Sequence, residues 1–250
     1  MVIGFSVCFP PHPSDKELET LEQILQAGCK AIELNPLLQR HKYQPSSDKF
    51  IELVNEFEYR SIHLPPDMYE SDKKVVDYYS ELARDIKAHS VTMHPASATA
   101  NIWLEDAFSQ NIGIENMDWR KTFGKSVSDF KEIFAAQPNA KWVCDTNHIL
   151  TNDHTMRLSK DFHAAFSDRL IHYHVSGFVN AYHPHGILFE TKQSEIVRGI
   201  LDKTKPIIIE SFGEGNLDEF QQELDYISPI LNGGDDGNRT HDLRNANAAL

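Results

Sequence analysis

The sequence predicts an α/β fold of one domain, a (β/α)8 barrel, and three observations support this prediction. Short apolar or β-branched runs recur about every 30 residues, and segments with helical periodicity fill the gaps between them. Strict alternation of strands and helices is typical of parallel strands joined by right-handed crossovers. The chain length of 250 residues suits an eight-stranded barrel of this kind.

Eight runs have the length and composition of buried strands: 2–7, 30–35, 59–64, 89–94, 111–116, 141–145, 170–175 and 205–211. Seven segments have apolar residues at helical spacing: 14–28, 46–57, 72–88, 126–137, 159–168, 192–204 and 217–230. The first of these begins at Ser14, a good N-cap, and ends at Gly28. We assign residues 1–231 to the barrel, and 232–250, which are polar and aperiodic, to a disordered tail.

Composition limits the classes of function. Apolar residues make up 40% and charged residues 24% of the chain, which is typical of a globular protein. No apolar run reaches the roughly 18 residues of a membrane span, and the first residues lack the basic region of a signal peptide. We therefore expect a cytoplasmic protein with no membrane partner. The net charge of −13 disfavours sequence-independent binding of nucleic acid, although bound cations would offset part of it.

The three cysteines, Cys8, Cys29 and Cys144, are scattered and lack CxxC spacing. This pattern indicates neither a disulfide framework nor a thiolate zinc site. We expect all three to be buried thiols.

Residues that commonly bind metals stand where the later apolar runs stop. A parallel barrel brings the carboxyl ends of its strands to one face, so these side chains are expected to meet there. Burying them together would be costly without compensation, and carboxylates with neutral imidazoles are the ligands that zinc or manganese prefers. We predict a divalent-metal site that contains His63, His94, Glu115, Asp145, His174 and Glu210.

Two local patterns add candidates. Asp145 and His148 stand three residues apart, where the sixth strand is expected to turn into a loop. His183 and His185 flank Pro184, and an extended backbone would direct both imidazoles to the same side. We expect His185 to be a metal ligand and His183 to contact either a metal or the substrate.

Three further polar residues lie on strands. Glu33 and Asn35 share one strand face, where they are expected either to support the metal ligands or to form a buried salt bridge. His172 stands two residues before His174 and is expected to be a hydrogen-bonded core histidine one layer deeper.

Eight motifs in residues 1–230 resemble those of the xylose isomerase-like barrel superfamily and, within it, the endonuclease IV family, which cuts DNA at abasic sites: IELNP, SIHLPP, TMHPAS, GIEN, VCDTNH, IHYHVS, HPHG and PIIIES. The resemblance implies three metal ions. His63, His94 and Glu115 resemble the ligands of the first, and Glu115 with Asp145, His174 and Glu210 those of the second. His148 and His185 resemble ligands of the third.

The chain also departs from the endonuclease IV pattern. His183 replaces an aspartate of that family, which puts the third ion in doubt because a neutral ligand replaces a charged one. Ser176 replaces another aspartate, and ENMDWRKTFG replaces a glycine-rich segment. In contrast, a basic and aromatic cluster stands where the family inserts a DNA-contacting loop, and we treat it as a candidate substrate-binding loop: Arg40, His41, Lys42 and Tyr43.

Three functions fit these residues. The favoured one is a zinc phosphodiester hydrolase for abasic-site DNA, with two or three Zn²⁺ ions activating water, Glu115 bridging ions and Glu210 orienting the nucleophile. The alternative is a sugar or sugar-phosphate isomerase or epimerase with one Mn²⁺ or Mg²⁺, in which Glu115 and Glu210 exchange protons with carbon. Isomerases of this superfamily often pair their barrels, so a homodimer is a candidate assembly in that case, although no interface is identified in the sequence. The third is a binder of metal or sugar without catalysis.

Overall fold

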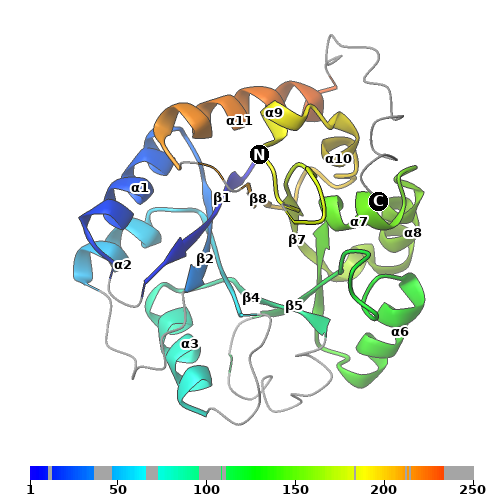
Figure 1. Ribbon diagram of the computed structural model, residues 1–250. Helices are drawn as coiled ribbons and strands as arrows, with labels where there is room; N and C mark the ends of the chain where they lie inside the picture. Colours follow the sequence, from blue (N-terminus) through cyan, green and yellow to red (C-terminus); the bar gives the residue numbers. More distant parts are fainter. Residues whose placement is uncertain are drawn as a thin grey trace.

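The computed structural model describes residues 1–10, 13–36, 47–65, 73–95, 108, 111–182, 184–211, 213 and 215–233. Eight parallel strands form a closed barrel in the order of the sequence, β1 to β8. Helices surround the ring of strands, as Figure 1 shows. The predicted fold class is therefore confirmed.

The strands lie where the sequence predicted them: β1 (Ile3–Phe9), β2 (Ala31–Pro36), β3 (Tyr59–His63), β4 (Ser90–Met93), β5 (Asn111–Glu115), β6 (Lys141–Asp145), β7 (Leu170–Val175) and β8 (Ile207–Ile209). The register between β6 and β7 shifts at Trp142 and Val143, and the other neighbouring strands pair without a recorded shift.

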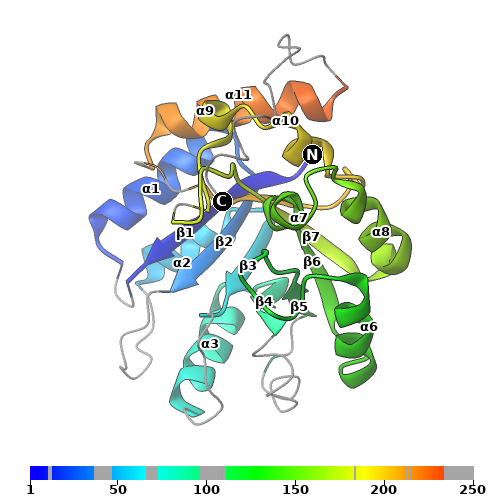
Figure 2. The ribbon, with the colours of Figure 1, turned by 45° about the vertical axis from the view of Figure 1, so that its right-hand side comes forward.

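The described helices form the outer layer (Figure 2): α1 (Asp15–Gln26), α2 (Asp48–Asn55), α3 (Lys73–Asp85), α6 (Val127–Ala136), α7 (Thr146–Asn152), α8 (Arg157–Phe166), α9 (Leu188–Thr191), α10 (Ser194–Arg198) and α11 (Leu217–Leu231), with the short 3-10 helix η1 (Ser167–Arg169). The prediction for 192–204 was too long, because only 194–198 is α-helical. The short helices α7 and α9 were not predicted. No helix in the described ranges is long and apolar enough to cross a membrane.

Polar residues fix where several helices begin. Ser14 and Glu17 form a reciprocal capping box at the start of α1. Ser47 accepts a hydrogen bond from the backbone N–H of Phe50 at the start of α2, and Asn216 caps α11 in the same way. Each cap satisfies a backbone donor that the first helical turn leaves without a partner. The helices therefore begin at positions that the sequence marks chemically.

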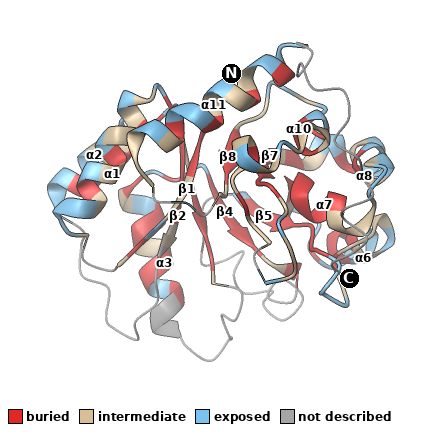
Figure 3. Ribbon diagram, turned by 45° about the horizontal axis from the view of Figure 1, so that its top comes forward, coloured by how far each residue is buried: buried red, intermediate tan, exposed pale blue. Residues whose placement is uncertain are grey.

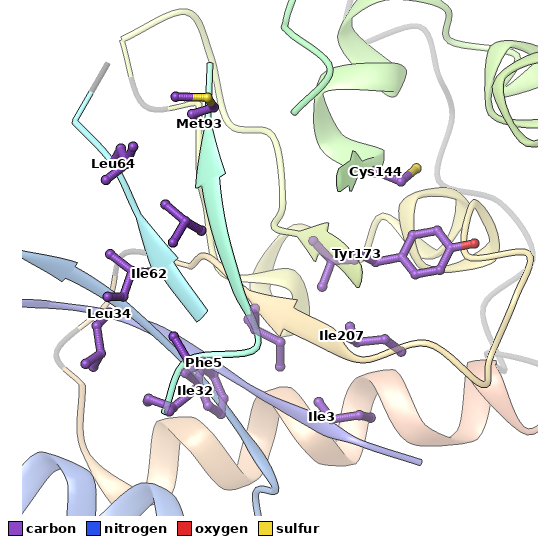
Figure 4. Close-up of a cluster of buried hydrophobic side chains, with 14 of the residues drawn as sticks. Ile3, Phe5, Ile32, Leu34, Ile62, Leu64, Met93, Cys144, Tyr173 and Ile207 are labelled. Atoms are coloured by element: carbon purple, nitrogen blue, oxygen red, sulfur yellow. The ribbon is translucent and has the colours of Figure 1, made fainter. Parts of the chain in front are cut away.

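The outward faces of the strands form the main hydrophobic core. Side chains alternate across each strand, so every second residue points towards the surrounding helices. Ile32, Leu34, Ile62 and Ile207 are among these residues, and all four are fully buried (Figure 4). Figure 3 shows the same layering, with buried strands inside and helices whose outer sides are exposed.

Several strands carry polar side chains on their inward faces, where a barrel interior usually has apolar layers. Glu33, Ser61, Thr92 and His172 are at most 1% exposed, and they come from β2, β3, β4 and β7. Buried polar groups need hydrogen-bond partners, and these four residues bond to one another or to neighbours inside the barrel. The polar interior lies directly beneath the strand ends that carry the candidate metal ligands.

Gly4 allows β1 and β2 to approach each other closely. A Cβ atom at Gly4 would lie 1.6 Å from the carbonyl oxygen of Ala31, and backbone atoms cannot yield as a flexible side chain can. We expect Gly4→Ala to lower the free energy of unfolding by about 3 kcal/mol or more, measured by urea denaturation. Gly28→Ala is the control, because no atom lies within 4 Å of that Cβ and only its φ of +87° adds strain, about 1 kcal/mol. Equal losses at both positions would contradict the steric argument.

Candidate metal centre and its cavity

The candidate site lies at the carboxyl ends of the strands, in a cavity of about 660 Å³. Six of the predicted site residues line this cavity: His63, His94, Glu115, His148, His185 and Glu210. Every predicted metal ligand except His183, which lies outside the described residues, belongs to a group whose ligand atoms lie within 4.8 Å of one another. The topology therefore brings the predicted ligands together.

Glu115, the last residue of β5, is at the centre of the site and is almost fully buried. Its Oε2 lies 3.3 Å from Nε2 of His63 and 3.2 Å from Nε2 of His94. Its Oε1 lies 3.0 Å from Nδ1 of His174. Because its two oxygens face different histidines, Glu115 can serve two neighbouring groups of ligands at once.

A second group surrounds Nδ1 of His174. This nitrogen lies 3.0 Å from Oε1 of Glu115 and 3.3 Å from Oε1 of Glu210. Asp145 completes the group at the end of β6. Its Oδ2 is buried, and it accepts no hydrogen bond from any described residue. A buried carboxylate oxygen that accepts no hydrogen bond is costly, and a bound cation would compensate for it.

The segment after β6 is a helix, so the prediction of a loop there was wrong. Asp145 acts as the N-cap of α7, because its Oδ1 accepts a 2.8 Å hydrogen bond from the backbone N–H of His148. Figure 2 shows α7 beside β6 and β7. The first turn of α7 carries His148 to the site, where its Nδ1 lies 3.3 Å from Oδ2 of Asp145.

His185 completes a third group with Asp145 and His148. Its ring centroid lies 5.6 Å from that of His148, and its Nδ1 lies 3.0 Å from Oγ of Ser176. The loop containing Arg40, His41, Lys42 and Tyr43 lies outside the described residues, and so does the tail from residue 234.

The ionisable groups strongly perturb one another. Burial, reinforced by the charge of Glu115, raises the pKa of Glu210 to about 8 despite the opposing effect of His174. Burial favours the neutral form of His63, but the hydrogen bond to Glu115 and the charge of Glu33 prevail and raise its pKa to about 9. Burial also opposes ionisation of Glu115, yet hydrogen bonds from His174 and His63 hold its pKa well below the usual value. In the metal-free site, protons therefore balance the carboxylate charges.

The donor set fits a divalent cation of the zinc or manganese type. It consists of carboxylate oxygens and imidazole nitrogens, which suit these ions. The buried Oδ2 of Asp145, which accepts no hydrogen bond from a described residue, supports the same conclusion. The residues present can therefore hold a metal.

Two features were not predicted correctly from the sequence. Asp118 is buried in the loop after β5, with its Oδ2 3.9 Å from Nε2 of His148, and it also pairs with Arg120. Asp118 lies beyond the end of β5, so it belongs to no alternating pattern that could have identified it. Only its position three residues after Glu115 indicated that it could lie near the site. Cys8 is exposed, not buried as expected, and it lines the cavity near the end of β1.

Glu33 is fully buried, and its Oε1 lies 3.1 Å from Nε2 of His174, so it both forms a buried ion pair and contacts a candidate ligand. Asn35 donates a 2.7 Å hydrogen bond to Ser6 and lines the cavity. His172 is a fully buried, hydrogen-bonded histidine, as predicted.

The fold and the strand-end site define an α/β barrel with a candidate divalent-metal centre. The chain is similar to the D-psicose 3-epimerase of Clostridium cellulolyticum H10, with a TM-score of 0.63 and 12% identity over 92% of this chain and 99% of the other. It is also similar to the D-allulose 3-epimerase of Methylomonas sp., with a TM-score of 0.66 and 17% identity over 92% of this chain and 98% of the other. An L-ribulose 3-epimerase matches with a TM-score of 0.64 and 14% identity over 93% of this chain and 95% of the other.

These likenesses agree with the predicted fold class, a (β/α)8 TIM barrel. The structures named are sugar epimerases, so they give no support to the predicted closeness to the endonuclease IV family. No protein-family model matches the chain, and no curated protein sequence matches it either.

The two roles of Asp145 can be separated by substitution. Asn is as good an N-cap as Asp, so Asp145→Asn is expected to keep α7 and the stability of the metal-free protein while weakening metal binding. Asp145→Ala is expected to lose both, with about 1 kcal/mol lower stability than the Asn variant. Urea denaturation in chelator and metal titration measure the two effects separately. Equal stability of the two variants would contradict the capping role.

Metal affinity is expected to depend on pH. His63 and Glu210, with raised pKa values of about 9 and about 8, hold protons near neutrality that a metal ion must displace. Affinity should therefore rise as the pH increases from about 7 to about 9, and binding should release at least one proton per ion. Calorimetry in two buffers of different ionisation enthalpy measures the release. An affinity that stays constant over this range would contradict the assigned protonation states.

Proposed function

We propose that the protein is a divalent-metal-dependent sugar isomerase or epimerase. The observation that carries the proposal is the group Glu115, Asp145, His174 and Glu210, in which two glutamates flank one imidazole nitrogen at the mouth of the barrel. The similar folds of three enzymes named as sugar 3-epimerases support a sugar as the class of substrate.

Glu115 and Glu210 suit the two proton transfers of such a reaction. One carboxylate removes the proton from the carbon beside a carbonyl, and the other returns a proton to the opposite face of that carbon or to its neighbour. Their pKa values differ in direction, since that of Glu115 is lowered and that of Glu210 is raised, and such a difference is typical of paired acid and base groups. A bound cation would polarise the substrate oxygens and make the carbon proton more acidic.

The cavity can hold and orient a small polyol. Its volume of about 660 Å³ falls in the range of small-molecule sites. Ser6 and Asn35 line one side, and their hydroxyl and amide groups can bind sugar hydroxyls. Arg120 also lines the cavity, but Asp118 already pairs with its guanidinium, and the net charge of the chain is −13. An uncharged sugar suits this cavity better than a polyanion.

One observation favours the second candidate, a zinc phosphodiester hydrolase acting on abasic-site DNA. His63 and His94 both approach Oε2 of Glu115, and His148 with His185 approaches Asp145, so the site offers more ligands than one ion needs. Two or three Zn²⁺ ions would use all of them. The number of ions per chain therefore separates the two candidates.

Metal stoichiometry is the first measurement, made by elemental analysis of protein purified without chelator. The proposed function predicts one manganese, magnesium or cobalt ion per chain, and the double variant His63→Ala with His94→Ala should keep that ion. Two or three zinc ions, at least one of them lost in the double variant, would contradict the isomerase and support the hydrolase, which an abasic-site DNA cleavage assay would then test.

Exchange of substrate hydrogen tests the chemistry directly. Ketoses incubated with the metal-loaded protein in D₂O should incorporate deuterium at the carbon beside the carbonyl, as followed by NMR. Glu115→Gln and Glu210→Gln should each slow this exchange by about 10²-fold or more, because each loses a proton-transfer group. Glu132→Gln, an exposed glutamate on α6, is the matched control and should exchange at the wild-type rate. Undiminished exchange in either active-site variant would contradict the assignment.

A further inference from the structure

We infer that Glu33 is a positioning residue that holds the imidazole of His174 in the orientation and tautomer required for metal binding. Glu33 lies on β2, across the barrel interior from β7, and its side chain is fully buried. The inference rests on the metal centre of the proposed function and does not depend on the identity of the substrate.

The carboxylate of Glu33 is fixed from two sides. Its Oε2 accepts hydrogen bonds from Oγ of Ser61, at 2.9 Å, and from Oγ1 of Thr92, at 3.0 Å. These hydroxyls come from β3 and β4, so three neighbouring strands set the position of one carboxylate. Its Oε1 is left directed towards Nε2 of His174, 3.1 Å away.

The two nitrogens of His174 face different partners. Nδ1 faces Glu115 and Glu210, which belong to the metal-binding group, and Nε2 faces Glu33. An imidazole that binds a cation through one nitrogen carries its hydrogen on the other. A carboxylate that accepts this hydrogen fixes the ring and makes the metal-binding nitrogen more basic. Glu33 occupies the place that this arrangement requires.

His172 supports the same ring from below. Its Nε2 lies 3.0 Å from Nε2 of His174, and its Nδ1 lies 2.8 Å from the hydroxyl of Tyr59, which in turn contacts Ser90 at 2.8 Å. These groups form a hydrogen-bonded floor beneath the metal centre. Glu33 differs from them in supplying a full negative charge to the far side of His174.

Glu33 could instead be a direct ligand, since its carboxylate also lies within 4.8 Å of ligand atoms of His63, His174 and Glu210. The contacts argue against this role. An ion between Glu33 and Nε2 of His174 would take the place of the hydrogen that this nitrogen is inferred to carry, and it would leave Nδ1, which faces Glu115 and Glu210, without a cation. The number of bound ions distinguishes a positioning residue from a ligand.

The test is a Co²⁺ titration of the full-length protein, followed by visible absorption, with the metal-free stability measured in parallel by urea denaturation. Glu33→Gln keeps the side-chain shape but removes the charge. We expect it to weaken Co²⁺ binding by about 10- to 100-fold with an unchanged number of ions per chain. Ser159→Ala is the control, because it removes a buried hydrogen bond to Gly199, neither residue lines the cavity, and the Co²⁺ affinity should stay unchanged.

A second variant tests the inference independently if Glu33→Gln fails to fold. Ser61→Ala with Thr92→Val keeps Glu33 but removes the two hydroxyls that hold it, and it should weaken binding several-fold. Wild-type Co²⁺ affinity in both variants, or the loss of one whole ion in Glu33→Gln, would overturn the inference. Failure of the wild-type protein to bind Co²⁺, Zn²⁺ or Mn²⁺ would instead overturn the proposed function, so the two failures are distinguishable.

Discussion

The structure depends on compensating a concentration of buried charge at one end of the barrel. Glu33, Glu115 and Asp145 are almost completely buried, and so is His174. Isolated buried charges are very unfavourable, and they persist only with partners of opposite charge and complete hydrogen bonding. Here the imidazoles and the carboxylates are interleaved, so each carboxylate faces at least one histidine. Either protons or a bound cation can neutralise the remaining negative charge of the carboxylates. The chemistry proposed for the site requires a cation to take the place of some of these protons.

This arrangement places stability and function on opposite faces of the same strands. The outward side chains, such as Ile32 and Ile62, bury apolar surface against the helices, and burial of this kind is the main stabilising contribution to folding. The inward side chains of the same two strands include Glu33 and Ser61, which contact each other. Because the two sets alternate along each strand, the interior can be polar without removing apolar contacts from the core around it.

Much of the fold and of the site could be predicted from the sequence, because the carboxyl ends of all strands in a parallel barrel lie at the same face. His63 and Asp145 end apolar runs, and that pattern alone placed them at the mouth. Helix α7 was missed because TNHILTN is short and rich in residues that rarely favour helices; its formation depends on the cap supplied by Asp145 and on packing against β7. The loop position of Asp118 carries no periodic signal. The substrate could not be chosen from the sequence, since both enzyme classes use Glu115 and Glu210.

Asp145 divides its two oxygens between separate tasks, one bonded to the backbone of α7 and the other directed into the site. Its rotamer is therefore selected when the chain folds, and the entropy of ordering this side chain is lost at that stage, before any ion arrives. Such a ligand is preorganised and can bind without rearranging. The same geometry narrows what evolution can accept at this position, because a replacement must fit a helix terminus and a coordination sphere together. In such a site, one bound cation can be replaced by another more readily than Asp145 can be replaced by another amino acid.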